Sequence, residues 1–185
     1  MPIRRKPIQA TLLGASSERV VMKQAAADEN PNDAVVREFT WNLAAINIHM
    51  EDIRRIWADL LGVSGPQWLI LMAISELDAG KGVSVGEVST KLQVHQSFVT
   101  TQTKNLERSG FLIRTTSSAD ARIVLMSLTE KARKEIGKLT ARRNKLNDFI
   151  FADMSDRSLR DITDSLTLIK YRVEKAALQL DLDNS

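Results

Sequence analysis

The feature that most constrains this chain is a long row of apolar residues near its N-terminal end. From Val36 to Leu60 the apolar positions alternate in steps of three and four: Val36, Phe39, Leu43, Ile46, Met50, Ile53, Trp57 and Leu60. This spacing places them on one side of an α-helix of about 27 residues, roughly 40 Å long. Gly62 ends the predicted helix. A helix of this length cannot bury its apolar side alone, so it needs a partner surface.

A second row of the same kind lies near the C-terminal end. It comprises Leu159, Ile162, Leu166, Ile169, Val173, Ala176 and Leu180. We expect the two long helices to pack on each other and on a second copy of the chain. The sequence therefore predicts an obligate homodimer that buries more than about 2,000 Å² in total.

The segment between these helices has the pattern of a small, compact module. A buried helix is predicted over residues 67–77, because it is apolar nearly all round. Ser84 and Glu87 then form a capping box that opens a short helix ending near Leu92. Another helix is predicted from His95 to Ser109. Two short helices joined by three or four residues indicate a helix-turn-helix.

Two β-rich runs follow the second short helix directly. The first covers residues 111–114, the polar turn covers 115–121, and the second run covers 122–128. A hairpin in this place is a wing. The predicted fold class is mainly α with a small β wing: a winged helix-turn-helix module between long N- and C-terminal dimerisation helices.

Basic residues concentrate in the middle of the chain. Residues 81–145 carry 13 basic and 5 acidic side chains, whereas the whole chain has a net charge of only +3. Such a block is a candidate surface for a polyanion, the alternative being an ordinary solvated helix face. The first 32 residues show no sustained period and include Arg4, Arg5 and Lys6. We expect a flexible basic arm there, which either enters a minor groove or has no role.

Several classes of protein are disfavoured by what the sequence lacks. The absence of cysteine removes disulfides, thiolate chemistry and a cysteine redox sensor, and two distant histidines disfavour a metal site. There is no phosphate-binding loop, dinucleotide fingerprint, zinc-protease motif or serine elbow, so we expect no enzyme and no cofactor. The longest apolar run has seven residues, Trp68 to Ile74, too few for a membrane span. We expect a cytoplasmic protein.

Residues 83–133 resemble the MarR family of winged helix-turn-helix transcriptional regulators. The matching residues are Leu92, Ser97-Phe98-Val99-Thr100, the run from Leu106 to Leu112, Arg114, Asp120-Ala121-Arg122 and Leu128-Thr129-Glu130-Lys131-Ala132. The Asp-x-Arg motif with Leu-Thr-Glu six residues later is the most specific part. The order of elements also matches over about residues 35–180. The resemblance implies a homodimer on a pseudo-palindromic operator in double-stranded DNA.

The resemblance also implies which residues contact DNA. On the second short helix these are Gln96, Ser97, Thr100, Thr101 and Lys104, which would enter the major groove. In the wing, Arg122 matches the arginine that reaches the minor groove, and Asp120 matches the acid that holds that arginine in place. The alternative for Asp120 and Arg122 is a plain salt bridge in a turn.

The family further implies a small effector, often an aromatic acid, and in some members a coenzyme A thioester of one. Candidate ligand-binding residues are His49, Trp57, Trp68, Met72 and Arg143. For the tryptophans the alternative is ordinary core packing. Arg143 occupies an inward position of the helix that follows the wing, so it needs a partner. That partner is either an internal acid, Asp52 or Asp59, or an anionic effector.

These expectations divide the chain into functional regions. Residues 1–32 are the flexible arm, 33–62 and 146–185 the helical dimerisation region, 63–128 the winged module, and 129–145 a connecting basic helix. The predicted function is a repressor of aromatic-compound metabolism genes, released by an aromatic acid or its thioester. The rival readings are an architectural DNA-binding protein without an effector and a coiled-coil interaction protein with a degenerate winged module.

Overall fold

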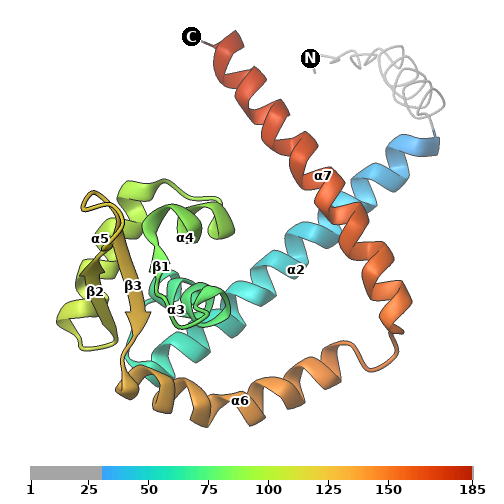
Figure 1. Cartoon of the computed structure of the whole chain (residues 1–185). Helices are drawn as coiled ribbons and strands as arrows, with labels where there is room; N and C mark the ends of the chain where they lie inside the picture. Colours follow the sequence, from blue (N-terminus) through green and yellow to red (C-terminus); the bar gives the residue numbers. More distant parts are fainter. Residues whose placement is uncertain (1–30, 185) are drawn as a thin grey trace, which may run out of the picture. The chain divides into compact units, whose positions relative to one another are not determined.

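A computed structural model describes residues 31–184, and the basic arm predicted for residues 1–32 lies almost wholly outside that range. The described chain has the element order α2 (Pro31–Leu61), α3 (Gly65–Leu77), β1 (Val83–Ser84), α4 (Val85–Leu92), α5 (Gln96–Arg108), β2 (Leu112–Thr116), β3 (Val124–Leu128), α6 (Glu130–Ile150) and α7 (Asp156–Asp183) (Figure 1). This order confirms the predicted fold class, mainly helical with a small sheet.

The chain divides into two compact units, one ending at Trp68 and the other beginning at Leu69. The first contains α2 and the start of α3. The second contains the rest of α3, the sheet and the remaining helices. The helix-turn-helix and the wing therefore lie together in the second unit.

Local sequence signals account for most of the helix ends. Gly62, with a φ of +70°, follows the last residue of α2, as predicted. Ser64 and Gln67 form the expected reciprocal cap at the start of α3, since each backbone N–H donates to the other side chain. Ser84 and Glu87 do the same for α4. Thr129 and Ser155 cap α6 and α7.

The sheet has three antiparallel strands in the order β1-β3-β2. Val83 pairs with Met126, and Leu112 pairs with Leu128. Strand β1 pairs with the predicted hairpin but was not itself predicted, because two residues are too few to show a period in the sequence. Strand β2 continues to Thr116, beyond the predicted end at residue 114. Strand β3 starts at Val124, after the predicted start at residue 122.

The core of the second unit is formed by apolar residues from α3 to the start of α6. Its fully buried members include Ile70, Leu71, Ile74, Val83, Val88, Val99, Leu106 and Met126. The helix predicted to be buried, α3, contributes three of these side chains. The core thus joins the helix-turn-helix, the sheet and the base of α6 into one packed body.

The two long apolar rows remain exposed in the single chain. In α2 only Trp57 of the eight row residues is buried, and Ile46, in the middle of the row, is 58% exposed. Helix α7 contains no buried residue. Apolar side chains on this scale are rarely left in contact with water over the length of a helix.

Candidate nucleic-acid interface

Helix α5 is held in place by one narrow apolar side. Val99, Thr103 and Leu106 are buried, and they follow one another at helical spacing. The helix starts after His95, which adopts an extended backbone but makes no side-chain cap. The preceding turn contains Gln93 in the left-handed region, with a φ of 53°. This tight turn lets α4 and α5 share the core while the other side of α5 faces water.

The exposed side of α5 carries most of the residues predicted to bind DNA. Gln96, Ser97, Thr101 and Lys104 are exposed, and Thr100 is half-buried. The hydroxyl of Thr101 donates to the backbone oxygen of Ser97 at 3.0 Å, so it retains lone pairs for an outside donor. At 100° per residue, Ser97, Thr101 and Lys104 fall opposite the buried side, whereas Gln96 and Thr100 lie at its margin.

One exposed cation on the same side was missed by the sequence reasoning. Arg108 is exposed and lies one turn after Lys104, in the row that starts at Ser97 and Thr101. Its guanidinium is 3.5 Å from the side-chain oxygen of Asn105. The spacing of four from Lys104 could have identified it, because residues four apart lie on one side of a helix.

The turn of the wing is held by short hydrogen bonds within the hairpin. Asp120 accepts the backbone N–H of Arg122 at 2.9 Å, and the N–H of Ile123 donates to the backbone oxygen of Asp120 at 3.0 Å. Both Asp120 and Arg122 are exposed. The carboxylate thus shapes the turn by holding the backbone of Arg122.

The wing is also joined to α5 by a partly buried ion pair. Arg114 of β2 lies 3.6 Å from the carboxylate of Glu107 on α5, and its side chain is only 14% exposed. A buried guanidinium beside a carboxylate restricts the movement of both elements. This ion pair therefore links the wing, which carries Arg122, to helix α5, which carries Lys104 and Arg108.

The helix before α5 is fixed by its capping box. Ser84 donates its backbone N–H to the carboxylate of Glu87 at 2.7 Å, and the Ser84 hydroxyl donates to the same carboxylate oxygen at 2.6 Å. These hydrogen bonds, chiefly the one from the hydroxyl, lower the pKa of Glu87. Because β1 ends at Ser84, this cap also joins α4 to the sheet.

The predicted ligand-binding residues differ in how far they are buried. Arg143 is half-buried on the inward side of α6, as predicted, and its guanidinium Nη1 lies 3.3 Å from the sulfur of Met72. Trp57 and Trp68 are 7% and 4% exposed, which fits the core alternative. His49 is exposed. Of the two acids considered for Arg143, Asp52 pairs with Arg55 on its own helix at 3.0 Å.

Residues 31–184 offer neither a metal-ligand cluster nor a single helix that could span a membrane. No group of three or more metal-ligating side chains occurs in this part of the chain. No single described helix is long and apolar enough to cross a membrane, and only α2 and α3 taken together meet the length and composition of a span.

Comparison with known proteins identifies relatives of this chain. A model of the MarR family matches residues 61–123. The transcriptional activatory protein BadR of Rhodopseudomonas palustris is 25% identical over 152 residues, covering 80% of this chain and 85% of that protein. The structure of Streptococcus pneumoniae FabT in complex with DNA shares 27% identity over 76% of this chain and 98% of that one, with a TM-score of 0.57.

The fold is also similar to that of S. aureus MepR in a DNA complex. That match has a TM-score of 0.63 and 16% identity, and it covers 73% of this chain and 96% of the other. Its low identity supports the fold alone. Together, the family model, the mostly helical fold with its wing, and the placement of α5 agree with the resemblance found in the sequence. Residues 61–123 match the MarR family of transcriptional regulators, and the chain shares its winged fold with the DNA-bound structures of FabT and MepR.

Proposed function

We propose that this protein is a cytoplasmic, homodimeric repressor of aromatic-compound metabolism genes. It binds a pseudo-palindromic operator, and an aromatic acid or its coenzyme A thioester releases it. The observation that carries the DNA part of the proposal is the exposed row on α5, held opposite a fully buried side. The homodimer rests on the apolar rows of α2 and α7, and the effector site rests on Arg143 and Met72.

The exposed side of α5 has the chemistry of a major-groove reader. Ser97 and Thr101 offer hydroxyl groups, which both donate and accept hydrogen bonds, and Lys104 and Arg108 offer positive charge. An α-helix fits the major groove of B-DNA, where base edges present distinct donors and acceptors. Lysine and arginine at the end of the row suit either a guanine edge or a phosphate.

The wing offers one exposed cation on a shaped turn. Asp120 holds the backbone of Arg122, and both residues face water. A narrow minor groove has an enhanced negative potential that attracts arginine. Since the Arg114–Glu107 pair joins the wing to α5, we propose that Arg122 enters the minor groove beside the site where α5 reads bases.

The homodimer is supported by the exposed apolar rows of α2 and α7. These helices have 31 and 28 residues, and almost all of their row residues are open to water in the single chain. Two copies would cover these rows and set two recognition helices about one turn of DNA apart, roughly 34–36 Å. A pseudo-palindromic operator follows from this symmetry.

The effector site is proposed around Arg143 and Met72. A half-buried guanidinium beside a polarisable sulfur suits a ligand with a carboxylate or phosphate next to an aromatic ring. Trp57, Trp68 and His49 remain proposed contacts for the ring and its polar tip. Effector binding would favour a dimer arrangement that misfits the operator.

The test is fluorescence anisotropy of the full chain on DNA from upstream of its own coding region. Arg122→Ala should weaken operator binding about tenfold or more, the usual effect of losing one good contact. Arg157→Ala, which removes an exposed cation from α7, serves as the control and should bind like the wild type. Equal affinities for the wild type and Arg122→Ala would remove the wing from the proposal.

The same assay tests the effector. Aromatic acids and their coenzyme A thioesters are added at fixed salt, and release by either class supports the ligand-gated part of the proposal. Tighter binding on addition would contradict release by the effector, and a transcription assay would then test activation, the role in the name of its relative BadR. No response, together with weak sequence preference and a steep salt dependence, would favour the architectural alternative.

A further inference from the structure

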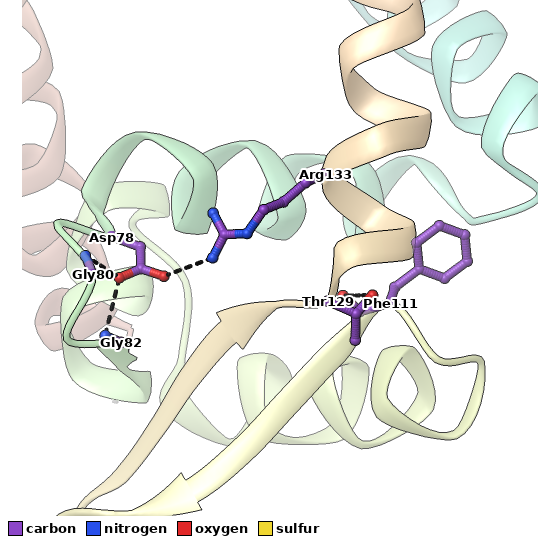
Figure 2. A network of polar contacts seen from close by, with 6 residues as sticks. All are labelled: Asp78, Gly80, Gly82, Phe111, Thr129 and Arg133. Atoms are coloured by element: carbon purple, nitrogen blue, oxygen red, sulfur yellow. Dashed lines mark hydrogen bonds and ion pairs between the residues drawn. The ribbon is translucent and has the colours of Figure 1, made fainter.

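The turn between α3 and β1 is organised by one buried carboxylate. The side chain of Asp78 is only 2% exposed. Its Oδ1 accepts the backbone N–H of Gly80 at 2.8 Å and that of Gly82 at 3.0 Å. Figure 2 shows both bonds converging on the same oxygen. The carboxylate thus fixes the path of the chain from the end of α3 to the start of the sheet.

This turn lies directly against the wing strand β3. Gly82 has a φ of +77°, and a Cβ atom added there would lie 3.1 Å from Cβ of Leu125 and 3.2 Å from the hydroxyl of Ser127. No larger residue fits this place without displacing β3. One residue later, β1 pairs with β3. Any movement of the Asp78 turn is therefore transmitted to the wing.

The second oxygen of Asp78 faces helix α6. Oδ2 is buried and lies 3.6 Å from Nη2 of Arg133, in the first turn of α6 (Figure 2). Burial raises the pKa of Asp78, but the N–H groups of Gly82 and Gly80, the Ser127 hydroxyl and the charge of Arg133 together hold it below its ordinary value. The carboxylate is therefore charged at neutral pH, and Arg133 supplies the opposite charge.

Helix α6 has another attachment at its N-cap, Thr129, to the turn that precedes β2. The Thr129 hydroxyl donates to the backbone oxygen of Gly110 at 2.8 Å, and the Thr129 N–H donates to that of Phe111 at 3.1 Å. Figure 2 shows the Thr129–Phe111 contact at the start of α6 and Arg133 reaching from the helix toward Asp78. Together with the packing of Ala132 and Ile136 in the core, these two polar attachments restrict the tilt of α6.

We propose that Asp78 and Arg133 are a positioning pair that sets the angle between the wing sheet and helix α6. Helix α6 leads from the module toward α7, whereas the wing leads toward DNA. This angle therefore affects the direction in which α6 leaves the module toward α7. The pair also sets which spacing of the two operator half-sites the dimer accepts, and this step rests on the proposed function.

The first test measures the angle without DNA. The chain contains no cysteine, so Thr115→Cys on β2 and Asn144→Cys on α6 place two spin labels at exposed positions. Labelled chains are diluted with unlabelled ones, so that only distances within one chain are read by pulsed electron paramagnetic resonance. Arg133→Gln should broaden the distance distribution, and Lys134→Gln, a neighbouring exposed cation, should leave it unchanged. An unchanged distribution in Arg133→Gln overturns the proposal, whether or not the protein binds DNA.

The second test measures the spacing preference on an operator selected from random DNA. The affinity for this operator is divided by the affinity for versions with one base pair added or removed between half-sites. Arg133→Gln should lower this ratio by about 2- to 30-fold, the range expected for residues that couple two parts of a protein. Affinity for a single half-site should not change, whereas a general loss of folded protein would lower this affinity and leave the ratio unchanged. An unchanged ratio contradicts the proposal.

Two further variants separate positioning from folding. Asp78→Asn keeps an oxygen for Gly80 and Gly82 but loses the charge, so it should lower the ratio as Arg133→Gln does, and the double variant should do no more. Arg133→Lys keeps the charge and should restore part of the ratio. Additive effects of the two single variants would mean that the residues act separately, against the proposal. If the wild type selects no operator, the proposed function fails, and the distance measurement still decides the positioning pair.

Discussion

The winged module and the two long helices bury their apolar residues to very different extents. In the module, Ile70, Leu71, Val88 and Val99 are wholly buried within a single chain. Helix α7 buries none of its residues, and the row of α2 is mostly open. The module can therefore hold its shape by itself, whereas the helices have sequence patterns that only association can satisfy. The module buries its core within one chain, whereas the long helices carry apolar rows that the single chain leaves mostly exposed.

The largest effect should come from a charge in the exposed row of α2. Ile46→Glu places a carboxylate at the centre of the proposed dimer interface, where an unpaired charge costs about 3–5 kcal/mol. Light scattering coupled to size exclusion should then give the mass of one chain. Ile48→Glu is the matched control, because residue 48 lies on the opposite side of the helix. A dimeric Ile46→Glu protein would refute the assigned interface.

A core substitution tests the other side of the comparison. Leu106→Ala removes a side chain that is 1% exposed, which should lower the free energy of unfolding by about 3 kcal/mol. Urea unfolding of this variant should show the same loss in the background of Ile46→Glu, because the module core belongs to one chain. Ile113→Ala, at a position 51% exposed, should cost less than about 1 kcal/mol. Equal losses at the two positions would contradict the placement of the core.

Two helix caps allow a finer comparison of the regions. Ser84→Ala removes the capping box of α4, and Ser155→Ala removes the cap of α7. Each change should cost about 1 kcal/mol where the helix is part of the folded unit. In the monomeric Ile46→Glu background, the cost of Ser84→Ala should remain and that of Ser155→Ala should vanish. Urea unfolding followed by circular dichroism measures both costs. If the cost of Ser155→Ala also persists in the Ile46→Glu background, the predicted difference between the two regions is wrong.

The smallest expected effect is the contribution of Asp78 to the stability of the module at acidic pH. The pKa of Asp78 lies below its ordinary value of 3.8. Its charge therefore stabilises the module fully above pH 3.8, and this contribution is lost as pH falls through the lowered pKa. Thermal unfolding of the Ile46→Glu monomer should show a steeper loss of stability below about pH 4 than Asp78→Asn in the same background. Parallel curves would mean that Asp78 contributes nothing to the acid response.

Much of this architecture could be read from the sequence, and the reasons differ between regions. Rows spaced by three and four predicted α2 and α7, and the capping residues Ser64, Ser84 and Thr129 marked helix starts, because these signals are local. The family resemblance singled out Gln96, Ser97 and Thr101, and the structure leaves all three exposed. Strand β1 was missed because two residues carry no period.

The contacts that depend on distant residues could not be read in this way. Asp78 and Arg133 are 55 positions apart, and nothing in either neighbourhood names the other. For Arg143 the sequence indicated an inward cation that needed a partner, and the structure places the sulfur of Met72 beside it. Periodicity gives the side of a helix on which a residue lies, but the residue it meets depends on how the elements pack.

The measurement that tests the central claim most directly is hydrogen exchange across the whole chain. Amide protection is compared between the wild type and Ile46→Glu by mass spectrometry under identical conditions. We expect the amides of α2 and α7 to lose protection in the variant, while those of α4, α5, β2 and β3 keep their protection. Long helices that stay protected in a monomer, or a module that loses protection together with them, would contradict this expectation.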